Sequence, residues 1–341
     1  MSKLKHRPKI RKTRFQKNIF LALLALSLIA ILIIFGKVSN FFTSLNRPIT
    51  KDTQYNKSQP WNGQSNINIV IKLDTINVLS YNPHTQEIII LKIPDEVYLN
   101  LALGFGTYPT RSIYKLGESE PVPIGPRLLK ETMSQTLGVP IDNYIFVNDQ
   151  TLFEVEKLIA GIRQNPFITI SLISQSKTDL TPIEYLNFVI KLKGVRADKI
   201  KGVDLKNSSI TSSLLLPDGS RALSFDLVKL DRLIQDEFTD SSINDESLSV
   251  AIFNGTNHPR LAENAARLIT NMGGRVVFTS NSQSKFTKGY VLGDGSYTKD
   301  RLREIFTTCR QCDINNPEVM SSRSQITVIL GEDYYQRLNK R

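Results

Sequence analysis

The sequence predicts an α/β protein with two folded domains behind one N-terminal transmembrane helix. Three observations support this fold class. Residues 18–36 form an uncharged apolar run. Strand-like and helix-like segments are mixed through residues 66–240, as in a mixed sheet flanked by helices. Residues 248–333 follow the order β-α-β-β-α-β of a small two-layer α/β domain. The length of 341 residues allows about two domains of ordinary size.

The N-terminal tail carries most of the excess charge. Residues 1–17 hold eight basic side chains and no acidic one, while the rest of the chain has 35 basic against 32 acidic residues. The apolar run 18–36 would span roughly 28 Å as a helix, close to the thickness of the hydrocarbon core. Since a basic flank stays on the cytoplasmic side, we expect a cytoplasmic tail and extracytoplasmic domains on a single-pass cell-membrane protein.

A cleaved signal peptide is the alternative for the same segment. Its apolar core is longer than the usual ~7–15 residues, and no small-x-small cleavage site follows it, which favours an uncleaved anchor. The basic tail is explained by topology and by attraction to anionic membrane lipid, so no nucleic-acid partner is expected. Residues 37–65 are polar and interrupted by Pro48, Pro60 and Gly63, as in a stalk.

The first domain begins with three strands. Residues 67–72 alternate in polarity, and residues 75–81 and 87–93 flank a polar turn, which predicts a hairpin. Thr181, Pro182 and Glu184 have the spacing of a capping box at a helix start. The remaining expected elements are helices at 126–137, 152–162, 182–192 and 225–238 and strands at 144–148 and 214–216.

Residues 239–247 are polar and acidic, which predicts a linker before the second domain. In that domain we expect strands at 248–253, 275–279, 289–292 and 324–330, and helices at 260–272 and 299–307. Its two cysteines, Cys309 and Cys312, form either a local disulfide or two free thiols, and the sequence does not decide between them.

Common catalytic signatures are missing, including a phosphate-binding Gly-Lys-Ser/Thr loop, a Gly-x-Ser-x-Gly elbow, a His-Glu-x-x-His pair and a calcium loop. The informative stretch is residues 72–98, KLDTINVLSYNPHTQEIIILKIPDEVY. It resembles the LytR-CpsA-Psr family, in which an Arg-Ser-Asp-Thr motif opens a strand and a hairpin leads to Ser-Ile-Pro-Arg-Asp-Thr. Asp74-Thr75 matches the first motif and Ile93-Pro94 the second.

Two further segments carry the resemblance. Residues 138–144 (GVPIDNY) are similar to the stretch before the family's next strand. Residues 250–256 (VAIFNGT) and 328–333 (VILGED) resemble the C-terminal domain that often follows in this family. The matches occur in the expected order behind the expected anchor.

The resemblance implies an activity and a site. Enzymes of this family transfer a glycopolymer from a polyprenyl-pyrophosphate carrier to peptidoglycan with Mg²⁺, so the implied partners are membrane lipid, the lipid-linked polymer and peptidoglycan. Asp74 is the implied catalytic and metal-binding residue. The implied substrate-binding residues are Lys72, Arg111, Lys115 and Arg127.

The chain departs from the family pattern at this site. Lys72 replaces the first motif's arginine, and Asp95 and Glu96 replace the second motif's Arg-Asp. A unit charge about 5 Å from a phosphate is worth about 3 kcal/mol at an effective dielectric of about 20, so an acid in place of Arg reverses that contribution. We therefore expect a divergent active site in a phosphotransferase, with a non-catalytic glycan-binding or scaffold protein as the alternative.

Simpler structural roles also fit these residues. Asp74 could satisfy a turn, Asp95 and Glu96 could be solvated, and the three basic residues after them could be surface charges. The apolar stretch 98–108 could cover a lipid cavity or pack against the core. Residues 254–256 could bind an anion or simply form a turn that precedes a helix.

Overall fold

The computed structural model describes residues 23, 24, 26–28, 37, 45, 47–50, 60–147, 154–167, 169, 171, 177–207, 209–216, 219–306 and 323–339. The chain divides into a unit of residues 1–47 and a compact unit of residues 48–341. Within the described positions, no helix is both long and apolar enough to cross a bilayer. Most of the predicted span 18–36 lies outside those positions, as do Cys309 and Cys312, so the anchor and the state of the cysteines stay predictions.

A six-stranded mixed sheet forms the centre of the first lobe, which we define as the described residues from 48 to 239. Its strand order is β7-β6-β1-β2-β3-β8. Strands β1, β2 and β3 are successively antiparallel, whereas β6 runs parallel to β1 and β8 parallel to β3. The strands are β1 (Ile67–Lys72), β2 (Ile76–Asn82), β3 (Glu87–Ile93), β6 (Asn143–Phe146), β7 (Lys177–Thr178) and β8 (Ile200–Asp204). The predicted β2–β3 hairpin is confirmed.

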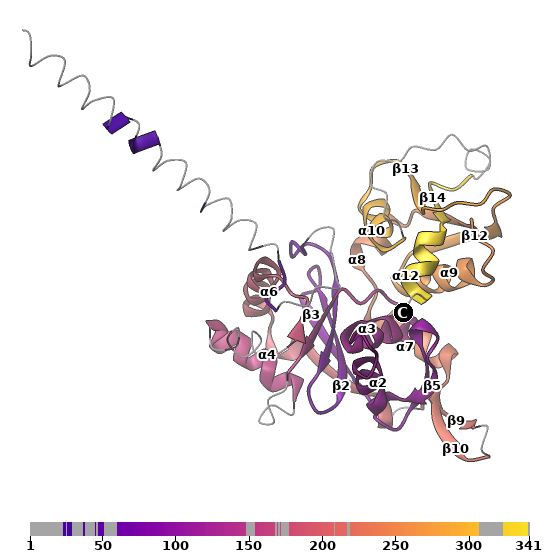
Figure 1. Ribbon diagram of the computed structural model, residues 1–341, viewed down its shortest axis with the longest axis horizontal. Coiled ribbons are helices and arrows are strands. Elements are labelled where there is room, and N and C mark those ends of the chain that lie inside the picture. The colour runs from indigo at the N-terminus through magenta and orange to yellow at the C-terminus, as the bar shows by residue number, and fades with distance from the viewer. Residues whose placement is uncertain are drawn as a thin grey trace, which may run out of the picture. The chain divides into compact units, whose positions relative to one another are not determined.

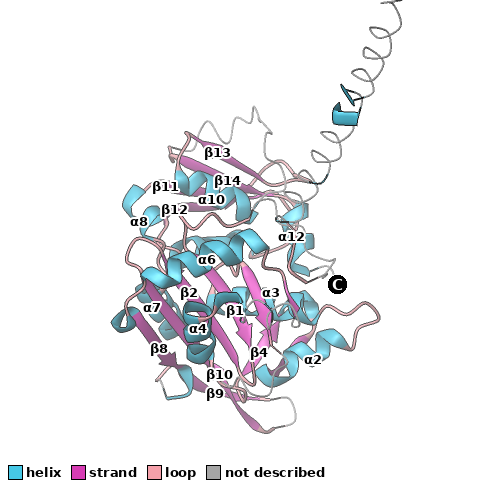
Figure 2. Cartoon of the chain, turned by 90° about the vertical axis from the view of Figure 1, so that its left-hand side faces the viewer, coloured by secondary structure: helices cyan, strands magenta, loops and turns pink. Residues whose placement is uncertain are grey.

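Helices cover both faces of this sheet because alternate strand residues point to opposite sides. In β1, Val70 joins one apolar cluster, while Ile69 and Ile71 join the other. Figure 2 shows α4 (Val155–Gln164) and α6 (Pro182–Gly194) across one face. The opposite cluster contains side chains of α2 (Ile113–Glu118), α3 (Gly125–Leu137) and α7 (Leu227–Glu237). The expected mixed sheet flanked by helices is therefore confirmed.

Two small ribbons complete the first lobe. One pairs β4 (Tyr98–Leu101) with β5 (Gly106–Pro109), and the other pairs β9 (Thr211–Leu215) with β10 (Arg221–Phe225). Figure 1 shows the β9–β10 ribbon projecting from the body of the lobe. Short 3-10 turns are η1 (Ala102–Gly104), η2 (Thr110–Ser112), η3 (Ala197–Lys199) and η4 (Leu205–Asn207).

Local signals placed several ends correctly. Thr181 accepts from the N–H of Glu184 at 3.2 Å, and the Glu184 carboxylate accepts from the N–H of Thr181 at 2.9 Å, which completes the predicted capping box of α6. The helix predicted at 225–238 begins later, because Phe225 ends β10 and Asp226 caps α7 through the N–H groups of Val228 and Lys229.

The second lobe, which we define as the described residues from 240 to 339, contains the predicted β-α-β-β-α-β order together with two helices that were not predicted, one before it and one after it. Its sheet order is β12-β11-β14-β13. A core beneath one face of that sheet contains side chains of all its helices. The elements are α8 (Ser241–Glu246), β11 (Ser249–Asn254), α9 (Leu261–Asn271), β12 (Arg275–Asn281), β13 (Tyr290–Gly293), α10 (Tyr297–Phe306), β14 (Ile326–Leu330) and α12 (Glu332–Asn339).

The expected linker at 239–247 is wrong, because most of it is the helix α8. Ile243 is buried in the second-lobe core. Asp240 caps the helix through the N–H of Ser242 at 3.0 Å and also accepts from the Tyr297 hydroxyl at 2.6 Å. From composition alone, the acidic residues of this segment would be expected to face water. In the structure, the Asp240 carboxylate instead accepts hydrogen bonds from a neighbouring backbone N–H and from a side-chain hydroxyl.

The second lobe caps the C-terminal end of α3. Arg267 donates to the carbonyl oxygens of Gln135 at 2.7 Å and Thr136 at 2.8 Å, and Asn271 donates to that of Leu137 at 3.1 Å. These carbonyls belong to the last turn, where a helix has no acceptor partners of its own. Gly138 ends the helix at φ 64°. Side chains of the second lobe therefore supply the hydrogen-bond donors that the last turn of this first-lobe helix lacks.

Candidate functional site

Strand register brings the predicted acids to one edge of the central sheet. Lys72 pairs with Ile76, which in turn pairs with Ile93 on the next strand. Asp74 lies in the turn after β1, and Asp95 follows β3 by two residues, so both leave the sheet at the same edge. The sequence prediction that these motifs meet is consistent with this register.

The β4–β5 ribbon returns the chain to that edge. The N–H of Arg111 donates to the carbonyl oxygen of Asp95 at 3.3 Å, and the N–H of Thr110 donates to that of Val97 at 2.8 Å. Arg111 is exposed, and Lys72 is half-buried with Nζ 3.2 Å from the carbonyl oxygen of Leu73. The base of the ribbon thus places Arg111 close enough to Asp95 for its charge to act on that carboxyl.

Asp95 is the electrostatic centre of this edge. Burial raises the pKa of its carboxyl, and the charges of Glu96 and Asp74 raise it further, while Lys72 and Arg111 oppose the shift. Glu96 is fully exposed and forms a 3.5 Å ion pair with Lys206. Its own backbone hydrogen bond and Lys206 hold its pKa below the usual value. We define Lys72, Asp74, Asp95 and Arg111 as the Asp95 cluster.

The other two predicted substrate ligands are placed differently. Lys115 on α2 is exposed and shares a shallow depression of about 410 Å³ with Arg111 and Ser119. Arg127, in the first turn of α3, donates from Nη2 to the carbonyl oxygen of Arg337 at 3.0 Å. The structure thus brings Arg111 to the cluster and directs Arg127 to α12.

The donor set for a metal is limited to two carboxylates. Across the described ranges, no group of three or more His, Cys, Asp or Glu residues is arranged to hold a metal ion. The charge of Asp74 contributes to raising the pKa of Asp95, after burial and the charge of Glu96. Mg²⁺ is commonly bound by one or two carboxylates together with substrate phosphate oxygens, so these two residues fit a site that a phosphate ligand completes.

The stretch 98–108 packs inward. Leu99, Leu101 and Leu103 are buried in the first-lobe core with residues of α3. The N–H of Ala102 donates to the Thr132 hydroxyl of that helix at 3.1 Å. Neither the shallow depression nor the larger groove described below is lined by Asp74. For these leucines, packing against the core, rather than covering a lipid cavity, is therefore the observed role.

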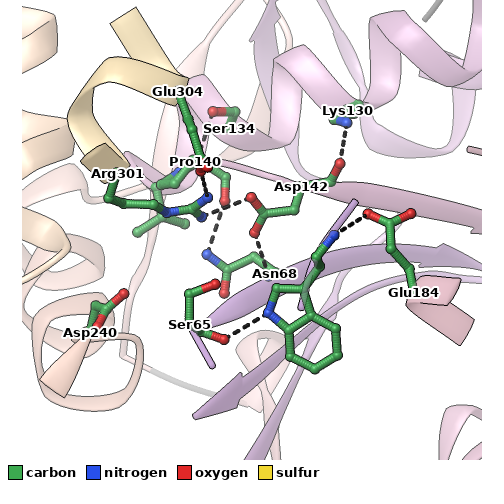
Figure 3. A network of polar contacts seen from close by, with 12 residues as sticks. Ser65, Asn68, Lys130, Ser134, Pro140, Asp142, Glu184, Asp240, Arg301 and Glu304 are labelled. Atoms are coloured by element: carbon green, nitrogen blue, oxygen red, sulfur yellow. Dashed lines mark hydrogen bonds and ion pairs between the residues drawn. The ribbon is translucent and has the colours of Figure 1, made fainter. Parts of the chain in front are cut away.

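Sequence reasoning missed a buried polar network between the lobes (Figure 3). Arg301 Nη2 lies 2.7 Å from Asp142 Oδ1, and Asp142 Oδ2 accepts from the N–H of Asn68 at 2.9 Å. Nearby, the buried Lys130 Nζ lies 3.0 Å from Asp179 Oδ2. Asp142 belongs to the segment GVPIDNY that resembles the family, but its partner is 159 residues away, so local spacing carries no signal for the pair.

Comparison with known proteins supports this architecture. The family model described as "LytR cell envelope-related transcriptional attenuator", the LytR C-terminal model, matches residues 247–334. A curated relative from Oceanobacillus iheyensis, named polyisoprenyl-teichoic acid–peptidoglycan teichoic acid transferase TagU, is 26% identical over 168 residues. These two matches support the resemblance of the chain to the LytR-CpsA-Psr family.

The match to that relative is partial, since it covers 43% of this chain and the chain spans about half of the relative's length. Solved structures to which the chain is similar include the transcriptional regulator yvhJ from Bacillus subtilis, at 17% identity and a TM-score of 0.38 over 51% of this chain and 97% of that chain. Another is the LytR-CPS2A-psr family protein YwtF (TagT) with bound octaprenyl pyrophosphate lipid, at 13% identity and a TM-score of 0.35 over 55% and 93%.

Proposed function

We propose that this protein is a membrane-anchored phosphotransferase of the LytR-CpsA-Psr type, which moves a glycopolymer from a polyprenyl-pyrophosphate carrier to peptidoglycan. The observation that carries the proposal is the Asp95 cluster, in which two acids and two bases converge from three separate segments. The name of the Oceanobacillus relative describes the same class of transfer. The predicted anchor at 18–36 would hold the site at the outer face of the membrane that contains the lipid carrier.

Each residue of the cluster has a role in this proposal. Asp74 and Asp95 would hold Mg²⁺, which when bound neutralises pyrophosphate oxygens and the developing charge on the leaving group. Arg111, exposed beside Asp95, would bind a phosphate oxygen through its guanidinium. Lys72 supplies a second positive charge but lacks the bidentate geometry of arginine. Lys115 would extend the positive surface along α2.

The acidic residue Asp95 makes the proposed site dependent on cations. Without a metal, Asp74, Asp95 and Glu96 repel a pyrophosphate, and burial together with the neighbouring acids already raises the pKa of Asp95. A divalent cation reverses the balance of charge at this edge. Donor binding should therefore require Mg²⁺ more strictly than at a site in which an arginine replaces Asp95.

The experiment measures binding of a polyprenyl pyrophosphate to the full chain in lipid nanodiscs during an Mg²⁺ titration. One unit of charge at about 5 Å is worth about 3 kcal/mol, so Asp74→Asn should weaken Mg²⁺-dependent binding about a hundredfold and abolish polymer transfer. The matched control is Asp198→Asn, because Asp198 is an exposed acid whose ion pair is with the exposed Arg196. An unmodified chain that binds no donor at any Mg²⁺ concentration refutes the proposal.

A non-catalytic glycan-binding or scaffold protein is the second candidate. The specific observation in its favour is Asp95 itself, because an acid stands where the family pattern has the phosphate-binding arginine. This candidate predicts that the full chain binds purified peptidoglycan equally with Mg²⁺ and with a chelator, and that no polymer is transferred. The two measurements together separate the candidates.

A further inference from the structure

A large open groove lies between the two lobes and is not explained by the Asp95 cluster. Its volume is about 1910 Å³. One wall comes from the β4–β5 ribbon and α3, and the other from α9, α10 and α12. Grooves at domain interfaces are common ligand sites, and this one needs the second lobe for half of its surface.

The groove follows the ribbon that leads away from the Asp95 cluster, although no residue of the cluster lines it. Tyr98, Asn100 and Thr107 of the β4–β5 ribbon line it, and the base of the same ribbon carries the hydrogen bond between Arg111 and Asp95. At its other end the ribbon reaches η1, which contacts α12 of the second lobe. A ligand lying along the ribbon would therefore extend from the reactive edge to the second lobe.

The charge of the lining restricts the class of ligand. Basic and acidic side chains line the groove in nearly equal numbers, and some already form ion pairs within it: Arg301 pairs with Asp142 and Glu304, and Arg303 pairs with Asp300. An anionic polymer needs a surplus of basic groups, which this groove lacks. An uncharged ligand rich in hydroxyl and amide groups matches a balanced polar surface.

Two half-exposed tyrosines suit sugar rings. Tyr98 and Tyr335 lie on opposite walls of the groove, and a tyrosine combines an apolar ring with a polar hydroxyl. One face of the Tyr335 ring is stacked on His258, with ring centroids 3.2 Å apart, which fixes its orientation and leaves the other face for a ligand. Arg301 is only 10% exposed and is paired with Glu304 and Asp142, so it offers no surplus positive charge to an anionic ligand.

We infer that the groove between the lobes binds an uncharged polysaccharide strand, with Tyr98 and Tyr335 as stacking surfaces and the second lobe as its outer wall. The inference rests on the proposed function in one respect: the strand would be the polymer acceptor, presented to a donor at the Asp95 cluster. The binding itself requires no catalysis.

The test measures binding of a hexamer of N-acetylglucosamine to the full chain in nanodiscs, with poly(glycerol phosphate) as the anionic comparison. Tyr98→Ala and Tyr335→Ala should each weaken hexamer binding about tenfold. Thr107→Arg, at an exposed groove position, should block binding without removing a core contact. The matched control is Phe278→Ala, since Phe278 is 50% exposed on β12 and does not line the groove.

Unfolding midpoints establish that each variant is folded. If a tyrosine variant does not fold, Thr107→Arg provides the test of the groove in its place. The inference is overturned if the hexamer does not bind at millimolar concentration, or if it binds equally to the groove variants. It is also overturned if the anionic polymer binds more tightly and the groove variants weaken that binding. Asp74→Asn should leave hexamer binding unchanged, so a failure of the transfer proposal is distinguishable from a failure of this one.

Discussion

Replacing Arg301 tests the energetics of the contact between the lobes. The Arg301 side chain comes from α10 and reaches Asp142, which directly precedes β6 (Figure 3). The two side chains are 10% and 18% exposed, so water replaces little of what either loses. Arg301→Met retains most of the side-chain volume and removes the charge. We expect it to destabilise the protein more than any substitution of an exposed ion pair.

The magnitude follows from what each neighbour retains. Among the described residues, the Asp142 carboxylate keeps the N–H of Asn68 at 2.9 Å on its other oxygen but loses its ion-pair partner, while the Lys130 ammonium stays on the Asp142 carbonyl oxygen. Glu304 is 47% exposed and is rehydrated. Breaking one partner of a buried pair costs about 3–5 kcal/mol, whereas an exposed pair is worth about 0–1 kcal/mol. We expect the cost of Arg301→Met to fall near 3 kcal/mol because Asp142 keeps one hydrogen bond.

Tryptophan fluorescence during urea unfolding provides the assay. Trp61 is the only tryptophan in the chain. It lines the groove, and its indole Nε1 donates to the carbonyl oxygen of Ser65 at 2.8 Å. Its backbone N–H donates to the Glu184 carboxylate at 3.0 Å. Its emission therefore reports on the first lobe beside the interface.

A double-mutant cycle separates loss of the pair from loss of packing. Arg301→Met with Asp142→Leu removes both charges and should recover most of the stability lost in Arg301→Met alone. The exposed pair of Arg196 and Asp198 is the control, with an expected cost below about 1 kcal/mol. A loss below about 1 kcal/mol for Arg301→Met, or no recovery in the double variant, would refute the reasoning.

Two further substitutions test other contacts of the second lobe. Burial alone would raise the pKa of Glu246, but hydrogen bonds from the Thr298 hydroxyl and two backbone N–H groups lower it below its usual 4.5. The stability that ionised Glu246 contributes is therefore complete above about pH 4.5 and is lost as pH falls through the lower folded-state value. Glu246→Gln should remove that acid-dependent part and cost about 1–2 kcal/mol at pH 7 in urea titrations; an unchanged pH profile contradicts the assignment. Gly138→Ala adds a Cβ only 2.6 Å from Asn271 Nδ2 at φ +64°, whereas Gly219→Ala at φ +82° meets no atom within 4 Å. The first should lower the free energy of unfolding by at least about 1 kcal/mol more than the second, and equal losses would show that the close approach of the lobes carries no cost.

The candidate site was predictable only in part. Asp74 and the residues after β3 were identified from their motif spacing, and the hairpin between them followed from alternating β-branched strands and a polar turn. Arg111 was a candidate because it is basic and follows the motif. Its position beside Asp95 depends on the β4–β5 ribbon, which the sequence prediction did not separate from the apolar stretch 98–108. Arg127 was an equally plausible candidate by sequence, yet its guanidinium binds the Arg337 carbonyl.

Features that depend on neighbours within a few residues could be predicted from the amino-acid sequence alone. These include the capping box at Thr181, the hairpin after Asp74, and the order of strands and helices in the second lobe. Such signals are local because capping and alternating burial are satisfied within one turn or one strand pair.

Only the tertiary structure decided which distant polar groups meet. It turned most of the acidic segment at 239–247 into a helix that buries Ile243, and it paired Arg301 with Asp142 across 159 residues. It also formed a groove whose lining comes from two lobes, and no motif in the sequence connects the residues of the two walls. A charged residue is expected to face water when only its sequence neighbours are considered. The folded structure shows whether a protein partner replaces that water.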